Sequence, residues 1–126
     1  MRSAPSRPPR LRIVTREIAP IDDLLAYADP ADPLVWARGG SWLVGVGSAV
    51  TLTAPAADAA TLADRWRDVA AAAVVDDHVK APGTGLIAFG ALPFDTQSAS
   101  SAVLTVPLLT VGSREGRTWA SWVLPD

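Results

Sequence analysis

The pattern of apolar and polar positions predicts β-strands over much of the chain. Residues 11–18 (LRIVTREI) are rich in apolar and β-branched residues, as expected for a strand. Residues 34–46 contain two alternating apolar runs separated by Gly39 and Gly40. Two glycines at this place favour a type I′ hairpin, because both turn positions of that hairpin need a positive φ.

A third alternating run follows this hairpin at residues 50–53. Gly45, Gly47 and Ser48 come before it and suggest a second tight reversal of the chain. Residues 34–53 are therefore predicted to form a three-stranded antiparallel meander.

Residues 58–75 carry the pattern of the main helix. Asp58 is suited to the N-cap, and the charged residues of the segment lie mostly away from its apolar side. We expect this helix to pack on the sheet with Trp66 as its anchor, as a core residue rather than a ligand-stacking one. The apolar stripe consists of Leu62, Trp66, Val69 and Ala73.

A short helix is predicted at residues 24–28, which ends before Asp29-Pro30. Asp22 and Asp23 precede it as a pair of carboxylates. Helix capping explains this pair better than a general acid and base.

Three strands are predicted in the last third of the chain, at residues 86–92, 102–111 and 117–124. Residues 113–116 (SREG) predict a hairpin between the last two. Pro107 cannot donate to a hydrogen-bonded ladder, so its strand should lie at an edge or carry a bulge.

These elements predict an α+β fold in which an antiparallel sheet carries the helix at residues 58–75 on one face. Trp119 and Trp122 should lie on opposite faces, because side chains alternate along a strand. One helix covers one face only, so we expect one of these two tryptophans to be exposed to solvent.

Composition narrows the class of protein. The apolar content of the 126 residues suffices for one domain, predicted at residues 11–126. Residues 1–10 are basic and Pro-rich and are expected to form a disordered tail.

No apolar run reaches the roughly 18–20 residues that span a bilayer. The absence of cysteine excludes disulfides and Cys-ligated zinc, and the net charge of −2 gives no general attraction to nucleic acid or membranes. We therefore expect a cytoplasmic protein.

Few residues suggest chemistry. Asp76, Asp77 and His78 resemble a metal cluster in the sequence, but neighbouring residues of an extended segment point in different directions and the chain has no second histidine. The fragment Gly83-Thr84-Gly85 lacks the third glycine of a dinucleotide fingerprint. On these grounds no catalytic, cofactor-binding or metal-binding residue is assigned.

Four segments, taken in order, nonetheless resemble a known family. They are PLVWARGGSWLVGVGSAVTLTA (33–54), DRWRDV (64–69), PGTGLIAFGALPFD (82–95) and RTWASWV (117–123). Together they are similar to the N-terminal portion of bacterial isochorismate synthases, which belong to the chorismate-utilising enzymes. WARGG and WLVGVG stand where anthranilate synthases usually carry L-L-E-S, so isochorismate synthase is favoured within the family. Arg outnumbers Lys ten to one, as is typical of high-GC bacterial coding.

The resemblance implies an Mg²⁺-dependent isomerase of the cytoplasm, in which water adds at C2 of chorismate as the C4 hydroxyl leaves. Isochorismate then feeds menaquinone or siderophore synthesis. The family's water-activating lysine lies in a strand resembling K-V-V-L-A-R, and this chain has no such strand. Its only lysine, Lys80, and its two glutamates, Glu17 and Glu115, stand outside the family's catalytic motifs. The resemblance therefore carries over no catalytic residue and no Mg²⁺ ligand.

Two interpretations follow. In the first, the chain is the front portion of an isochorismate synthase, from a truncated or split gene, and is inactive until a C-terminal catalytic half joins it. In the second, it is a stand-alone, non-catalytic interaction domain built on the same scaffold. A fragment of another family member, such as aminodeoxychorismate synthase, is a further alternative. A downstream reading frame that encodes the K-V-V-L-A-R-like and Glu-rich segments would favour the first.

Overall fold

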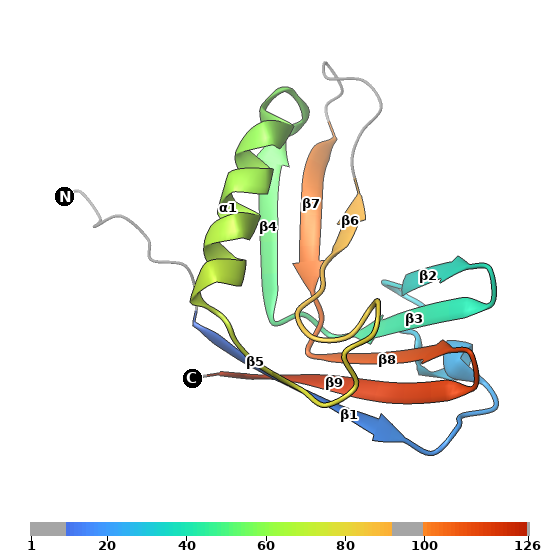
Figure 1. The fold of residues 1–126 in the computed structure, drawn as a ribbon. Coiled ribbons are helices and arrows are strands. Elements are labelled where there is room, and N and C mark those ends of the chain that lie inside the picture. Colours follow the sequence, from blue (N-terminus) through green and yellow to red (C-terminus); the bar gives the residue numbers. More distant parts are fainter. Residues whose placement is uncertain (1–9, 92–99, 126) are drawn as a thin grey trace.

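Two β-sheets and one α-helix make up residues 10–91 and 100–125, the part of the chain that this computed structural model describes (Figure 1). The helices are the 3₁₀-helices η1 (Leu24–Tyr27) and η2 (Ala56–Asp58) and the α-helix α1 (Ala59–Ala72). The strands are β1 (Leu11–Ile18), β2 (Leu34–Arg38), β3 (Ser41–Val46), β4 (Val50–Pro55), β5 (Val74–Asp77), β6 (Phe89–Ala91), β7 (Ser101–Val106), β8 (Leu109–Arg114) and β9 (Arg117–Pro125).

The larger sheet has the strand order β2-β3-β8-β9-β1-β5, and the smaller sheet has the order β4-β7-β6. All pairings are antiparallel except that of β1 with β5. Figure 1 shows the strands of the smaller sheet running crosswise to those of the larger one, with α1 alongside β4. The α+β class predicted from the sequence is confirmed.

The chain passes between the two sheets at two adjacent corners. One lies between β3 and β4, and the other between β7 and β8. The two corners are hydrogen-bonded to each other, from the Ala49 amide to the Val106 carbonyl at 2.7 Å and from the Leu108 amide to the Val46 carbonyl at 3.1 Å. Two neighbouring strands therefore bend together from one sheet into the other.

These corners correct two predictions. The glycines at 45 and 47 do not reverse the chain, so the three-stranded meander at residues 34–53 is wrong and only its first hairpin forms. The strand predicted at 102–111 is two strands, separated at Pro107 and Leu108. The two corners pack closely, since a Cβ at Gly45 would lie 2.7 Å from Cγ of Pro107, so position 45 favours glycine.

The main helix is shorter than predicted. It ends at Ala72, and Ala73 has an extended conformation (φ −75°, ψ 144°). Val74 and Val75 belong to β5, which pairs in parallel with β1. The alanine run favours helix, but β-branched valines favour a strand once a partner strand is available.

Helix α1 packs on the smaller sheet through the predicted apolar stripe. Leu62 and Val69 are buried, and Trp66 is half-buried against the same core. The capping prediction is wrong in detail, because neither Asp23 before η1 nor Asp58 before α1 makes a side-chain capping hydrogen bond. No helix within the described residues is long and apolar enough to cross a membrane.

The hairpins predicted at Gly39-Gly40 and at residues 113–116 are confirmed. Gly39 and Gly40 have φ of 57° and 83°, and Glu115 and Gly116 have φ of 51° and 78°, as in type I′ turns. A strand at 86–92 is confirmed only at 89–91, and Leu92 lies outside the described residues. Of the tail predicted at residues 1–10, the structure describes Arg10 alone.

Trp119 and Trp122 lie on opposite faces of the larger sheet, as predicted. Trp119 is 2% exposed, on the face turned toward the smaller sheet, whereas Trp122 is 39% exposed on the other face. Gly112 is the neighbour of Trp119 in the register, and a Cβ there would come within 2.4 Å of the indole. Glycine at 112 is therefore what lets the ring lie flat over β8.

We predict that Gly112→Ala lowers the free energy of unfolding by about 1–3 kcal/mol, because the indole of Trp119 must move out of a packed core. Urea denaturation followed by tryptophan fluorescence measures this. Gly90→Ala is the control, since its new methyl would meet only the movable end of Leu104 at 3.1 Å. Equal stability of the two variants would contradict this account of Trp119.

Candidate functional site

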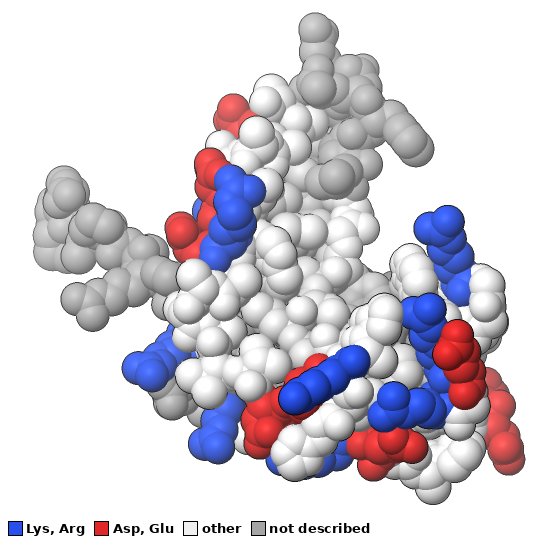
Figure 2. All heavy atoms as spheres, in the orientation of Figure 1, with Lys and Arg blue, Asp and Glu red and all other residues white. Residues whose placement is uncertain are grey.

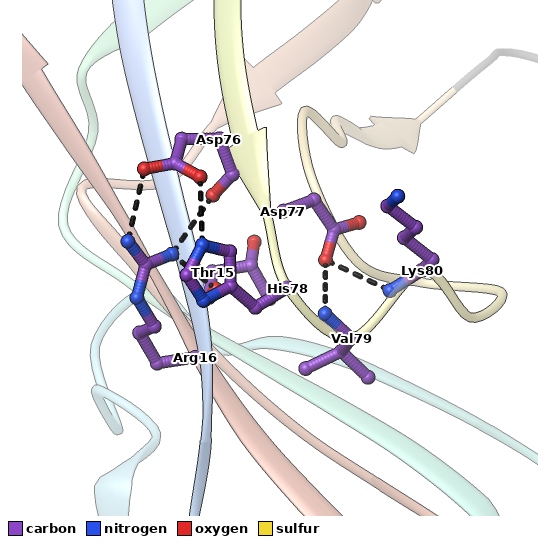
Figure 3. A network of polar contacts seen from close by, with 7 residues as sticks. All are labelled: Thr15, Arg16, Asp76, Asp77, His78, Val79 and Lys80. Carbon is purple, nitrogen blue, oxygen red and sulfur yellow. Dashed lines mark hydrogen bonds and ion pairs between the residues drawn. The ribbon is translucent and has the colours of Figure 1, made fainter.

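Of the three residues Asp76, Asp77 and His78, the first and the last lie together and Asp77 is apart from them (Figure 3). Asp76 accepts from Arg16 Nη2 at 2.9 Å and lies 3.2 Å from His78 Nε2. Asp77 points to the other side of the strand, as Figure 3 shows. No group of three His, Cys, Asp or Glu side chains placed to hold a metal ion is found in residues 10–91 and 100–125.

Asp77 organises the turn that follows β5. Its Oδ1 accepts the amides of Val79 at 2.8 Å and Lys80 at 2.9 Å, and its Oδ2 accepts the Thr84 hydroxyl. Partial burial raises the pKa of Asp77, but these hydrogen bonds outweigh burial and hold the pKa below its ordinary value. The pKa of Asp76 is also lowered, chiefly by the hydrogen bond from Arg16.

The segment after this turn is fastened to the buried face of the larger sheet. The Gly85 amide donates to Thr15 Oγ1 at 3.1 Å, and Thr15 Oγ1 lies 2.7 Å from Ser121 Oγ. Both hydroxyl side chains are buried. The PGTG segment of the sequence is thus structural and is not a phosphate-binding loop. We call residues 82–89 the cover, because they lie over this face.

A cleft of about 470 Å³ lies between this cover and the end of the larger sheet. The register places Trp36, Leu43, Gly112 and Trp119 in one row across β2, β3, β8 and β9. Their side of the cleft is apolar and aromatic. The cover contributes the opposite side, which includes Pro82, Gly83, Ile87 and Phe89.

Arg114 lies at one end of the cleft, and Arg38 is beside it in an adjoining hollow. The next row of the same face contains Arg38, Ser41 and Arg114, and these residues line this hollow of about 310 Å³. Arg114 lies 3.9 Å from Glu115, whereas Arg38 makes no ion pair within the described residues. An aromatic wall beside guanidinium groups is suited to a flat ligand that carries a carboxylate or phosphate.

This cleft was not predicted from the sequence. Trp36 and Arg38 stand two residues apart, which places them on one face of a strand. That spacing is the feature of the sequence from which an aromatic and a cationic side chain on one face could have been predicted. Their meeting with Trp119 and Arg114 depends on the pairing of β3 with β8, which no local pattern indicates.

The opposite face of the larger sheet is only partly covered. Helix η1 covers one part of it, where Leu24 packs on Val44 and Val111. Trp122 lies between Val14 and Leu109 in the register, outside the part of the face that η1 covers. Three large apolar side chains of this face are exposed, namely Trp122 at 39%, Leu124 at 44% and Val74 at 47%, and Arg12 lies between the last two in the register.

The remaining candidate groups have structural positions. Glu17 accepts from Arg117 at 3.0 Å across neighbouring strands, and Glu115 forms the β8–β9 turn. Lys80 has a φ of 56° in the turn after β5 and is exposed. Figure 2 shows charged side chains over the larger sheet and along α1, with a mostly uncharged surface between them.

Comparison with protein-family models, with curated proteins and with solved structures gave no match. The resemblance to isochorismate synthases therefore depends on the four sequence segments alone.

We predict that the protein loses stability in acid through Asp77. Its folded-state pKa is lowered, so its contribution is present above the unfolded-state pKa of about 3.9 and is lost as the pH falls through the folded-state value. Asp77→Asn should therefore be less stable at pH 7 and show a shallower decline below pH ~4. Urea denaturation at a series of pH values measures this, with exposed Asp68→Asn as the control. A steeper decline in Asp77→Asn than in the wild type would contradict the assignment.

Proposed function

We propose that this chain forms the N-terminal sheet scaffold of an isochorismate synthase, which converts chorismate to isochorismate with Mg²⁺ for menaquinone or siderophore synthesis. A separate catalytic segment supplies the base, the acid and the Mg²⁺ ligands. The chain contributes the two sheets against which that segment folds, and it has no turnover by itself.

The observation that carries this proposal is the open face around Trp122. Full burial of an apolar side chain is favourable by about 1.5–3 kcal/mol of free energy. Binding of another segment over half-exposed Trp122, Leu124 and Val74 would therefore be favourable. Exposed contiguous apolar surface commonly marks an interaction site. The family resemblance implies that the catalytic segment is what binds to this face.

The positions of the four resembling segments support a scaffold role. WARGG and RTWASWV form hairpins of the larger sheet, and DRWRDV lies in α1. In the PGTG segment, Gly83 and Gly85 have φ of 89° and 74°, and Thr84 binds Asp77. Each segment thus has residues with a structural role in the fold, as expected for a scaffold.

The charges on the open face around Trp122 limit which kind of surface can bind to it. Arg12 is exposed next to Leu124 in the register, whereas Arg16, beside Val14 along β1, already pairs with Asp76 on the same face. An apolar surface with a carboxylate placed near Arg12 would complement this face. We expect the catalytic segment to present such a surface.

Purified chain with chorismate and Mg²⁺ should form no isochorismate, as measured by chromatography of the products. Addition of a C-terminal segment that carries the K-V-V-L-A-R-like strand and the family's glutamates should restore turnover. Turnover by the chain alone would contradict the proposal. If that turnover were lost in Lys80→Ala, Lys80 would be the base.

The docking face is tested with a matched pair of variants. Trp122→Glu places a charge at the centre of the open face and should weaken binding of the catalytic segment about tenfold or more. Trp36→Glu is the control, because Trp36 is 46% exposed and the register places it on the opposite face, in the row of Trp119. Titration calorimetry measures both affinities. Equal affinities would show that this face is not the docking site.

A stand-alone interaction domain is the second candidate, and the cleft favours it. The cleft has an aromatic wall and Arg114 at one end, and Trp119 Nε1 is buried without a hydrogen-bond partner in the described structure. A monomer that unfolds cooperatively, binds no apolar dye and has no affinity for the catalytic segment would favour this candidate.

A further inference from the structure

Strand β2 is the outermost strand of the larger sheet on one side. Its one hydrogen-bonded neighbour in the described structure is β3. Four of its five residues are exposed, and Val35 and Trp36 are 38% and 46% exposed. The protein therefore presents an apolar strand edge to solvent.

The hairpin register indicates which backbone groups of β2 point outward. In a two-residue hairpin, the residues that flank the turn form a hydrogen-bonded pair, and such pairs alternate with non-hydrogen-bonded ones. Arg38 and Ser41 flank the turn, and Trp36 pairs with Leu43 two residues further on. The amides and carbonyls of Val35 and Ala37 therefore point away from β3. No other backbone hydrogen bond in the described part of the chain involves these two residues.

Natural edge strands are commonly protected by a proline, a central charge, a bulge or very short length. β2 has none of these within Leu34–Ala37, and its one charge, Arg38, lies at the end. The opposite edge of the sheet differs, since β5 has four residues and two of them are Asp76 and Asp77. β2 is thus the edge suited to pairing with another strand.

We propose that β2 pairs with β2 of a second copy of this chain, antiparallel and centred on Trp36, so that the larger sheets of the two copies become continuous. In this register Val35 of each copy lies opposite Ala37 of the other, and the outward-pointing backbone groups of both are satisfied. The two Trp36 side chains become a directly opposed cross-strand pair. Aromatic pairs of this kind stabilise sheets.

Charge complementarity supports the same register. Arg38 of one copy lies opposite Leu34 of the other, and Asp32 is two residues before Leu34. Asp32 is exposed in the bend before β2, so in this register it comes near Arg38 of the other copy, which makes no ion pair within the described residues of its own chain. Two-fold symmetry creates this pair twice. The two clefts then open on the same side of the joined sheet.

Sedimentation velocity over a range of micromolar concentrations tests the proposal with the whole chain. The wild type should dimerise. Val35→Pro removes an outward amide without disturbing the β2–β3 ladder and should weaken dimerisation at least tenfold, whereas Val35→Thr keeps that amide and should still dimerise. A monomeric wild type, or equal dimerisation of Val35→Pro and the wild type, would overturn the proposal.

A charge exchange tests the register without altering the strand. Arg38→Glu alone and Asp32→Arg alone should each self-associate several-fold more weakly, because each places like charges together twice. An equimolar mixture of the two variants should restore the dimer, since both cross pairs are then opposite in sign. A mixture no more associated than its components would overturn the proposed register.

These outcomes are independent of the proposed function. If Trp122→Glu abolished dimerisation and Val35→Pro did not, the copies would associate through the open face, and the β2 pairing would be wrong. If Val35→Pro were monomeric yet still supported reconstituted turnover, the β2 pairing would stand as a property separate from catalysis.

Discussion

The position of β1 between β9 and β5 is the arrangement on which the rest of the structure depends. It brings the first strand together with the last strand and with the strand that follows α1. Ile13 and Thr15 are fully buried at this place. Ile13 joins the core formed with α1 and the smaller sheet, and Thr15 holds the cover at Gly85. Without this pairing, β5 would have no partner in the larger sheet, β9 would lose one of its two neighbours, and the segment at Gly85 would lose its hydrogen bond to Thr15.

This dependence explains how much of the fold could be predicted. The hairpins at Gly39-Gly40 and Glu115-Gly116 were predictable because turn residues act on their own neighbours. The strand at Val74–Asp77 was missed because its partner β1 is far away in sequence and the alanines before it favour helix. Gly45, Gly47 and Pro107 indicated an interruption of the strands, but a reversal and a corner need similar residues. Only the pairing of the two corners distinguishes them.

The two faces of the larger sheet have different roles in this account. One face is covered within the chain by the smaller sheet, α1 and the segment around Gly85, except at the cleft beside β2, and it contains buried hydroxyl groups that hold this segment. The other face is covered by η1 at one end and is apolar and exposed around Trp122. A scaffold with one covered face and one partly exposed face fits the proposed role, in which the exposed face packs against a separate catalytic segment. This role is the central claim.

The most direct test of that claim is the solvent exposure of the individual tryptophans. ¹⁹F NMR of protein labelled with 5-fluorotryptophan, with Trp122 assigned from Trp122→Phe, reports each indole separately. The account predicts that Trp119 is protected from a soluble paramagnetic probe in the chain alone, and that Trp122 is accessible alone and becomes protected when the catalytic segment is added. If Trp122 is protected in the chain alone, or stays accessible in a mixture that converts chorismate, the account is contradicted.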